Sequence, residues 1–488
     1  MPRKNSRPHI VWFRDDLRLS DHPALTAAAQ SGAGVICLYV FDQQSLALAP
    51  PRARALGGAA CWWLAQSLKA LGAGLNALGV PLVLRKGPAA EIIVALAREV
   101  DAGCVCWNEI ATVPELAVAD GVAAALTEIG VASQSLPGDL LVHPTAIRNQ
   151  EGRSLRVFTP FWKRVQGLGD PPKPLAAPKT LTPANHVASE PLEHWLLQPT
   201  RPDWAGGLRQ TWTPGEAFAQ RRLAEFLMTG VAGYASERDR PDRDCTSKLS
   251  PHLRFGEISP RQIWHAARFA ATERPAVAGD IEKFLSELGW REFCRHLLFD
   301  VPDLAQANLR SSFDAFPWKA NREALQAWQR GQTGYPIVDA GMRELWHTGV
   351  MHNRVRMVAA SFLVKHLVID WRHGEQWFRD TLVDADPASN PANWQWVAGL
   401  GADAAPYFRI FNPVLQGEKF DPDGGYVRHW VPELAKLPPG LIHQPWTAPP
   451  LELAGAGVSL GKTYPQPIVD HRAGRERALS AYAAVRNA

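Results

Sequence analysis

Cysteine is scarce and unpaired in this sequence of 488 residues. The six cysteines include no Cys-x-x-Cys pair; they are Cys37, Cys61, Cys104, Cys106, Cys245 and Cys294. Cys104 and Cys106 lie on one face of an expected strand, and we interpret them as small buried apolar residues rather than metal ligands. There is no HExxH motif and no other cluster with metal-ligand spacing, so no metal site is expected. This use of cysteine fits a protein of the reducing cytoplasm.

Long apolar runs and a strong net charge are also absent. Residues 1–14 hold no apolar core of the length that a signal peptide needs. The most apolar helical stretch, residues 357–369, is interrupted by Lys365 and His366, so no transmembrane helix is expected. A net charge of +4 permits a local DNA-binding surface without requiring one.

Tyrosine is rare, with 7 residues, whereas tryptophan is abundant, with 19. Core packing explains most of these tryptophans. Stacking and redox chemistry around an aromatic cofactor is the alternative, and composition alone does not decide between the two.

Strand-like and helix-like segments alternate in the first 140 residues. The short apolar runs are residues 9–13, 35–41, 81–85 and 103–107. The alanine-rich helical stretches between them include residues 53–69, 89–100 and 115–128. This alternation predicts an α/β domain over residues 8–140, with a parallel five-stranded Rossmann-like sheet.

The rest of the chain changes character twice. Residues 141–213 are rich in Pro, Thr and Gln and have weak periodicity, which indicates an inter-domain linker. Helical patterns dominate from residue 214 onward. We therefore expect an all-α domain over residues 214–488.

A hydroxyl-rich segment, Thr246-Ser247-Lys248-Leu249-Ser250, stands near the start of the helical region. Its hydroxyl groups and its one cation suit hydrogen bonding to a pyrophosphate. A helix N-terminus with a solvated lysine is the alternative that the pattern leaves open.

Glu287, Trp290 and Arg291 lie three and four residues apart and so share one face of an expected helix. A carboxylate, a flat ring and a guanidinium together suit a polar heterocycle. The alternative is an ordinary ion pair beside a packed tryptophan.

A second helical face is expected to carry Asn353, Arg356 and Met357, with Arg354 projecting elsewhere. Such a face is costly to bury without partners, and Asp384 and Asp386 are the candidate partners of the cation. A surface network of ion pairs is the alternative. Residues 384–396 mix acids, amides and aromatics in a predicted loop that leads to a helix, a favoured place for function.

Several of these segments resemble the photolyase/cryptochrome family. The resemblance is carried by Thr333-Gly-Tyr-Pro-Ile-Val-Asp-Ala-Gly-Met-Arg343, by residues 351–357, 390–396 and 403–413, and by Val11-Trp-Phe-Arg-Asp-Asp-Leu-Arg-Leu19. It covers nearly the whole chain. It implies an α/β domain, a long linker and a helical domain that binds FAD.

The resemblance also implies which residues hold FAD. Tyr234 and the segment Thr246, Ser247, Lys248, Leu249 and Ser250 would hold the phosphates. The residues around the rings would be Glu287, Arg291, Asn353, Arg356, Asp384, Asp386 and Asn390.

Asn390 is the position that faces flavin N5 in this family, where an asparagine is similar to the repair enzymes and an aspartate or cysteine to cryptochromes. The carbonyl of the asparagine can accept from a protonated N5, and its amide can donate to a bare one. Trp394, Trp371 and Trp318 match the family's tryptophan chain, which passes electrons to the photoexcited oxidised flavin.

The lesion and the DNA are assigned in the same way. Glu287, Asn353 and Met357 would form a catalytic constellation around the flavin site. Trp290 and Trp396 would stack on a flipped dimer, with Glu287 and Asn353 bonding its polar edges. The positions that match DNA contacts are Arg238, Arg354, Arg409 and Gln416.

Two positions depart from the family pattern. Phe284 stands where an FAD-side tryptophan is frequent, which keeps the ring but loses its donor. Glu115 matches one of the usual folate-contacting pair, but its neighbour is Pro114, which offers no side-chain hydrogen bond. An antenna chromophore, either methenyltetrahydrofolate or a deazaflavin, is therefore an open expectation.

The implied activity is light-driven repair of cyclobutane pyrimidine dimers in UV-damaged DNA by a monomeric lyase with reduced FAD. A cryptochrome-type photoreceptor without repair is the first alternative; few residues follow Tyr464-Pro-Gln-Pro467 to serve signalling. A (6-4) photolyase would use two histidines where Asn353 and Met357 stand. A relative with an iron–sulfur cluster would need C-terminal cysteines, and none follows Cys294.

Overall fold

A computed structural model describes residues 7–48, 54–138, 140–403 and 408–486. The chain forms two compact units. The first, which we name the sheet unit, comprises Met1–Ala205, Trp212–Ala232 and Ser247–Asp303. The second, the helical unit, comprises Gly206–Thr211, Gly233–Thr246 and Leu304–Ala488.

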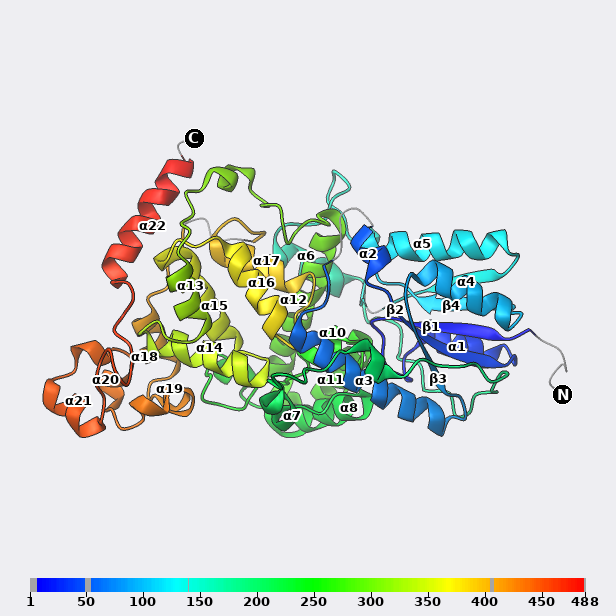
Figure 1. Ribbon diagram of the computed structural model, residues 1–488, viewed down its shortest axis with the longest axis horizontal. Helices are drawn as coiled ribbons and strands as arrows, with labels where there is room; N and C mark the ends of the chain where they lie inside the picture. The colour runs from blue at the N-terminus through cyan, green and yellow to red at the C-terminus, as the bar shows by residue number, and fades with distance from the viewer. Residues whose placement is uncertain (1–6, 49–53, 139, 404–407, 487–488) are drawn as a thin grey trace. The chain divides into compact units, whose positions relative to one another are not determined.

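The sheet unit is built on five parallel strands in the order β3-β2-β1-β4-β5 (Figure 1). The strands are β1 His9–Phe13, β2 Val35–Phe41, β3 Leu82–Lys86, β4 Cys104–Asn108 and β5 Ala132–Leu136. The central pair is in register from His9 opposite Val35. Strand β2 is buried along its whole length because helices cover both faces. The predicted parallel sheet is confirmed.

Helices connect the strands as the alternating pattern predicts. They are α1 Pro23–Gln30, α2 Gln44–Leu48, α3 Gly58–Ala77, α4 Ala89–Glu99 and α5 Val113–Glu128. Helices α4 and α5 pack on one face of the sheet, where Ile93 and Leu126 join Ile10, Ile36 and Val105 in one core. Successive side chains of a strand point to opposite faces of the sheet, so every second residue of these strands enters this core.

Strand β5 has no apolar run, and its sequence Ala-Ser-Gln-Ser-Leu is exposed over its first four residues. It lies at the edge of the sheet beside β4. Polar side chains on an edge strand discourage pairing with another chain. This explains why hydrophobicity locates only four of the five strands.

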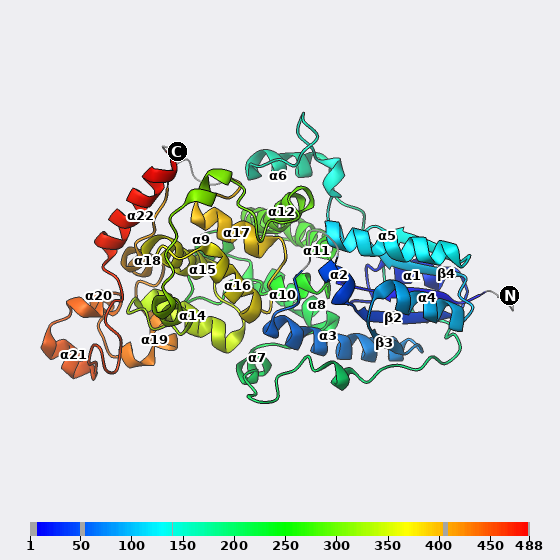
Figure 2. The same ribbon diagram turned by 45° about the horizontal axis from the view of Figure 1, so that its top comes forward.

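The sheet unit continues into a series of helices after the sheet. They are η1 Pro144–Ala146, α6 Phe158–Gly167, η2 Leu192–Trp195, α8 Glu216–Glu225, η3 Phe226–Gly230, α10 Ser250–Arg254, α11 Pro260–Glu273, η4 Pro275–Val277 and α12 Ala278–Asp300. Helices α6 and α12 pack side by side, as Figure 2 shows. The tight approach requires Gly289, because a Cβ there would lie 2.5 Å from the Trp162 ring.

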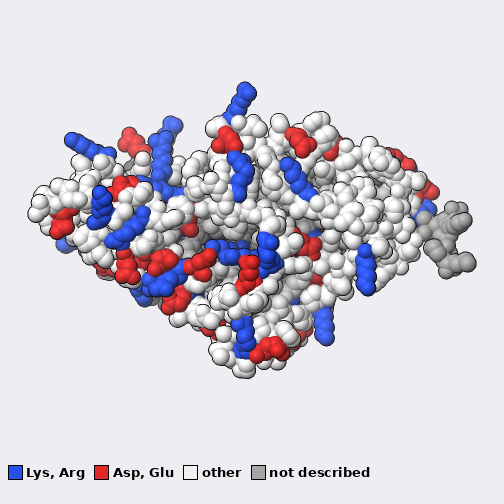
Figure 3. All heavy atoms as spheres, turned by 90° about the horizontal axis from the view of Figure 1, so that it is seen from below, with Lys and Arg blue, Asp and Glu red and all other residues white. Residues whose placement is uncertain are grey.

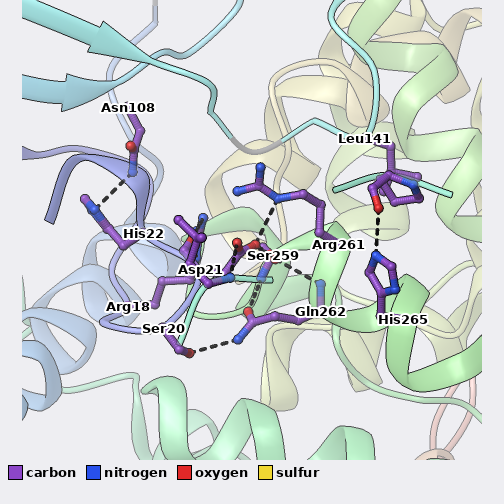
Figure 4. A network of polar contacts seen from close by, with 12 residues as sticks. Arg18, Ser20, Asp21, His22, Asn108, Leu141, Ser259, Arg261, Gln262 and His265 are labelled. Atoms are coloured by element: carbon purple, nitrogen blue, oxygen red, sulfur yellow. Dashed lines mark hydrogen bonds and ion pairs between the residues drawn. The ribbon is translucent and has the colours of Figure 1, made fainter. Parts of the chain in front are cut away.

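The loop after β1 carries a network of buried charges (Figure 4). Asp21 has a left-handed backbone, with φ of 50°, and its Oδ2 accepts from Ser259 Oγ at 2.5 Å and Arg261 Nε at 3.0 Å. Arg18 donates to the carbonyls of Asp21, at 2.8 and 3.1 Å, and of Gly256, at 2.9 Å. These bonds hold the segment that follows α10 against the first βα loop. Arg18, which belongs to the segment Val11–Leu19, therefore joins this loop to the residues after α10.

The helical unit contains helices and short helical turns throughout its described part. They are α7 Gly206–Thr211, α9 Tyr234–Glu237, η5 Ser311–Ala315, α13 Arg322–Gln329, α14 Pro336–Thr348, α15 Asn353–Ser361, η6 Phe362–His366, α16 Trp371–Thr381, α17 Ser389–Ala398, α18 Pro413–Phe420, α19 Gly425–Trp430, η7 Pro432–Leu434, α20 Pro439–Ile442, η8 Pro445–Thr447, α21 Pro450–Ala456 and α22 His471–Arg486. Among the described residues, no helix combines the length and the apolar character needed to cross a bilayer.

The segment Thr333–Arg343 is organised by a buried carboxylate. Asp339 accepts from the backbone N–H of Thr333 at 2.7 Å, from its hydroxyl at 2.6 Å and from Gly334 at 3.0 Å. The Tyr464 hydroxyl donates to it from the C-terminal part of the chain at 2.7 Å. Burial raises the pKa of Asp339, and these donors oppose that effect. The segment thus closes the core of the helical unit.

Candidate functional site

The predicted phosphate segment divides between the two units: Thr246 belongs to the helical unit, and the following residues belong to the sheet unit. Ser250 begins α10, Lys248 is exposed with φ of 53°, and Leu249 is buried. The carbonyl of Ser247 accepts from Arg222 Nε at 3.2 Å. The segment therefore anchors one apolar side chain and turns its lysine outward at a helix start. Tyr234, the other predicted phosphate contact, is buried at the start of α9.

Helix α12 carries Glu287, Trp290 and Arg291, as expected. Glu287 is half-buried and pairs with Lys283 at 2.8 Å. Arg291 pairs with Glu292 at 3.0 Å, and that fully buried carboxylate also accepts from the Leu141 N–H at 2.8 Å. These two ion pairs, Lys283 with Glu287 and Arg291 with Glu292, both lie within α12.

Trp290 is half-buried and stacks on Phe158 of α6, with ring centroids 3.8 Å apart and planes 7° apart. Phe293 meets it edge-on at 5.7 Å. One face of the indole is thus occupied by the protein itself. Phe284, one turn from Leu288 on the same helix, is buried against Phe226 with centroids 4.8 Å apart.

Arg356 on α15 has the carboxylate partner that its burial requires. Its Nη2 donates to both oxygens of Asp384, at 2.9 and 3.1 Å, and its Nε donates to the Met351 carbonyl at 2.6 Å. The second candidate partner, Asp386, has another task. Its Oδ1 accepts from the N–H groups of Ala388 and Ser389 at 2.9 and 2.7 Å, where α17 begins.

The other side chains of α15 lie differently from the expectation. Asn353 is exposed at the first position of the helix. Arg354 does not project away from Met357: its Nη1 approaches the Met357 sulfur at 3.9 Å. Positions three apart are neighbours on a helix, which corrects the predicted separation of the two residues. The Nη2 atom of Arg354 pairs with Asp239 at 2.5 Å.

Asn390 on α17 has a defined orientation. Its Nδ2 donates to the Glu375 carbonyl at 3.1 Å and to the Glu375 carboxylate at 2.9 Å. Both of these groups are acceptors, so the amide nitrogen faces Glu375 and the amide oxygen points away from it. Glu375 was missed in the sequence because its only signal is this contact between two helices.

The three tryptophans of the predicted chain range from buried to half-exposed. Trp394 and Trp371 are buried, and Trp318 is half-buried. Trp371 Nε1 donates to Asn308 at 3.0 Å, and Trp318 packs on Phe316 with centroids 4.3 Å apart. Trp394 fits only because Gly374 has no side chain: a Cβ there would lie 2.1 Å from its Cη2.

The predicted DNA contacts of the helical unit lie on several elements. Arg238 lies over the Tyr234 ring at 5.6 Å, and the exposed Arg409 lies over Phe411 at 4.8 Å. Gln416 is half-buried on α18, and Trp396 donates to the Asp403 carbonyl at 3.0 Å. Residues 404–407 of the 403–413 motif lie outside the described residues. On the face drawn in Figure 3, Lys and Arg are interspersed with Asp and Glu.

Glu115, the predicted antenna contact, lies in the first turn of α5 beside Pro114. Arg14 donates to its backbone carbonyl at 3.0 Å and also pairs with its carboxylate. Burial raises the pKa of Glu115, and the charge of Arg14 opposes that effect. The carboxylate therefore already has a protein partner.

Lys365 is a buried cation that the sequence showed only as an interruption of an apolar stretch. Its ammonium donates to the Ala398 carbonyl at 2.8 Å, where α17 ends. Burial lowers its pKa well below the ordinary value. Lys365 thus fixes the end of the helix whose beginning is fixed by Asp386.

The chain was compared with known proteins. Residues 284–484 match the family model of the FAD binding domain of DNA photolyase, and residues 9–179 match the model of DNA photolyase. A deoxyribodipyrimidine photo-lyase of Agrobacterium fabrum is 52% identical over 480 residues, which cover 98% of each chain. Cryptochrome-1 of Arabidopsis thaliana is 36% identical over 94% of this chain and 68% of its own length.

A solved structure gives the same result. The crystal structure of a bacterial class III photolyase from Agrobacterium tumefaciens has a TM-score of 0.95 and 51% identity, and the match covers 99% of this chain and 98% of that one. The five-stranded sheet and the helical region agree with this likeness. The chain belongs to the photolyase/cryptochrome family, and its C-terminal part is the FAD-binding domain of a DNA photolyase.

Proposed function

We propose that this protein is a deoxyribodipyrimidine photo-lyase, which repairs cyclobutane pyrimidine dimers in UV-damaged DNA in a light-dependent reaction. The observation that carries the proposal is similarity over the whole chain to a photo-lyase, which exceeds the similarity to cryptochromes. The reaction has no net redox change, so the enzyme is a lyase. The same proposal makes it a monomer of the cytoplasm.

The residues of the helical unit fit a flavin. Reduced FAD, when bound and excited by light, would supply the electron that splits the dimer. The electron would then return to the flavin. Arg356 and Asp384 form a charged pair with two hydrogen bonds. Asp386 and Lys365 fix the two ends of α17 and so hold Asn390 in place.

Asn390 gives the most specific support. Glu375 takes the amide nitrogen, so the group offered to the ligand is the carbonyl oxygen, an acceptor. An acceptor favours a flavin that carries a proton on N5. The orientation of this one side chain therefore favours the reduced cofactor that repair needs. Asn390 is also the residue type of the repair enzymes.

The remaining cofactor contacts are assigned by the resemblance. We assign the phosphates to Tyr234 and to Thr246, Ser247, Lys248, Leu249 and Ser250. The further contacts to the rings are Glu287, Arg291, Asn353 and Asp386. Trp394, Trp371 and Trp318 are assigned to the reduction of the resting flavin by light, and the change from buried to half-exposed along them fits electron entry from solvent.

The lesion is assigned to residues that offer flat rings and polar edges. Trp290 and Trp396 would stack on the extruded bases, and Glu287, Asn353 and Met357 would meet the lesion and flavin. The Phe158 ring covers one face of Trp290, so stacking uses the opposite face. Arg238, Arg354, Arg409 and Gln416 would bind the DNA backbone.

The domain limits follow the same proposal. Residues 8–140 form the antenna domain, residues 141–213 the linker, and residues 214–488 the domain that binds FAD and the lesion. The linker is not without structure, since α6 and α7 lie within it. An antenna chromophore, a folate or a deazaflavin, would meet Glu115 in the first of these domains.

The test is repair itself. Purified protein with chemically reduced flavin is mixed with dimer-bearing oligothymidine, and the dimers that remain are counted after blue light or darkness. We expect repair in light alone. Equal repair in darkness would contradict the proposal, and a flavin that is reduced by light without any repair would instead support a photoreceptor.

A further inference from the structure

Two arginines of α15 have carboxylate partners of different kinds. Arg356 makes three hydrogen bonds, two of them to Asp384, whose side chain is 4% exposed. Arg354 meets Asp239 through a single nitrogen, at 2.5 Å, and the two side chains are 18% and 34% exposed. In the first pair one nitrogen, Nη2, reaches both oxygens of a buried carboxylate, and the Arg356 side chain is 25% exposed. The second is a one-point contact that water and ions can reach, and such pairs are weak.

Arg354 is held ready for a further partner. Its guanidinium carbon lies 4.4 Å from the centre of the Phe420 ring, and Nη1 has only the Met357 sulfur, at 3.9 Å, as an acceptor. Its Nε is buried, and no acceptor for it occurs among the described residues. An arginine offers five N–H donors in a planar fork. Most of this donor capacity is unused while the plane of the fork is already set by the phenyl ring.

Asp239 belongs to a loop in which the signs of charge alternate. Residues 237–244 read Glu-Arg-Asp-Arg-Pro-Asp-Arg-Asp. Arg240 holds Asp242 through two bonds, at 2.8 and 2.7 Å, and these bonds lower the pKa of Asp242. The acids of this loop therefore balance its arginines, although Arg238 of the same loop is a proposed DNA contact. A loop built only to attract phosphate would not carry these acids.

We propose that Asp239 is an intramolecular competitor for DNA phosphate at Arg354. This inference rests on the proposed function. In the free protein the Asp239 carboxylate occupies the position of a phosphate oxygen. A DNA phosphate replaces it, and the flexible carboxylate turns to solvent while Arg354 keeps its place on Phe420.

The consequence is a lower affinity for DNA of any sequence. Each phosphate that an arginine neutralises releases about 0.9 counterion, but the displaced Asp239 carboxylate stays beside the DNA and cancels the added positive charge, so the net release at this contact is smaller. Asp239 therefore reduces the salt-dependent part of binding, which damaged and undamaged DNA share. Undamaged sites vastly outnumber lesions, so weaker general binding leaves more protein free to find a lesion.

The test is a double-mutant cycle on Asp239→Asn and Arg354→Gln, with the flavin-loaded protein and an undamaged labelled duplex. We expect Asp239→Asn to tighten binding about two- to fivefold, the range of a partly exposed ion pair. The slope of log affinity against log salt should steepen by about 0.9. Arg354→Gln should weaken binding about threefold in the wild-type background and about tenfold in the Asp239→Asn background, because only there is the arginine free of its competitor.

Asp242→Asn is the matched control, since it makes the same change of charge in the same loop at a different arginine. Equal tightening by Asp239→Asn and Asp242→Asn would overturn the inference, as would an equal cost of Arg354→Gln in both backgrounds. Asp239→Glu keeps the charge and should bind DNA as the wild type does. Light-dependent repair by the wild type is measured on the same sample, so a failure of the proposed function is seen separately.

Discussion

Polar side chains with several hydrogen bonds serve different ends in the two units. In the sheet unit, both carboxylate oxygens of Asp21 accept hydrogen bonds from the protein, Oδ1 from Leu175 and Oδ2 from Ser259 and Arg261. In the helical unit, Asn390 gives its nitrogen to Glu375 and keeps its oxygen. Burial of a polar group therefore does not identify a binding residue. The informative feature is the donor or acceptor that the protein leaves unused after its own bonds are made.

The largest effect is expected from breaking the Arg356–Asp384 ion pair of the helical unit. Asp384→Asn leaves the Arg356 cation without its charged partner, and breaking one side of a buried ion pair costs roughly 3–5 kcal/mol. We expect purified Asp384→Asn to lose nearly all of its flavin, seen as the ratio of flavin to protein absorbance. Glu452→Gln, at an exposed position of α21, is the control. Full flavin content in folded Asp384→Asn would contradict the assignment.

The matching change in the sheet unit should affect stability rather than flavin. Asp21→Asn keeps the shape and tolerates the left-handed backbone, but it removes the charge opposite the buried Arg261. We expect a loss of about 3 kcal/mol in the free energy of unfolding, measured by urea denaturation. The flavin content of the folded fraction should stay unchanged. A selective loss of flavin would show that the two networks are not separate in function.

A smaller effect is expected from the tryptophan chain. Trp371→Phe keeps a ring in the core but removes an oxidisable indole, so light should reduce the oxidised flavin about tenfold more slowly, equal to about 1.4 kcal/mol in the barrier. Repair by chemically reduced protein should be unaffected. The two rates are measured by flavin absorbance and by dimer counting. Normal photoreduction in Trp371→Phe would remove this residue from the chain.

The last test concerns acid stability, where the effect is about 1 kcal/mol for each pH unit. Burial lowers the pKa of His296 in the sheet unit to about 4, against 6.5 for a free imidazole. The folded state therefore favours the neutral ring, so this contribution to stability is complete above pH 6.5 and is lost as the pH falls toward 4. His296→Gln keeps a donor for the Val142 carbonyl, which His296 meets at 3.0 Å. It should flatten the stability curve by about 1 kcal/mol per pH unit in that range.

His352 and His366 extend the acid comparison to the helical unit. Burial lowers their pKa values to about 4 and about 3. Two histidines of the helical unit thus oppose protonation, against His296 in the sheet unit, so the helical unit should lose stability more steeply as the pH falls. Hydrogen exchange followed from pH 7 to 4 should show the helical unit losing protection at a higher pH than the sheet unit. A simultaneous loss would mean that the two units unfold together.

The sequence predicted the fold well where burial imposes a period. The runs of β1 and β2 were located to the residue, and β3 and β4 within one residue, because all four lie under helices. Strand β5 could not be located, since its exposed edge needs no apolar pattern. The helix of Glu287 and the helix after Asp386 were also predicted correctly.

The site was only partly predictable. The spacing suggested Asp384 for Arg356, but it could not separate Asp384 from Asp386, which caps α17 instead. Glu375 left no trace in the pattern because its contact with Asn390 joins two different helices. Lys365 was visible as a charge in an apolar stretch, yet its role depends on where α17 ends in space. Such partners are set by tertiary packing, which sequence periodicity does not record.

The contact between Gly374 and Trp394 has a consequence for how this protein can vary. The space that a Cβ would need at Gly374 is filled by the indole, 2.1 Å away. A larger residue at 374 is compatible only with a smaller ring at 394, so the two positions can drift only as a pair. Loss of the indole would remove the tightest of these restrictions and leave the Leu363 side chain, 2.7 Å from the same Cβ, as the other. Position 374, which has no side chain at all, therefore restricts which residues can replace Trp394 and Leu363.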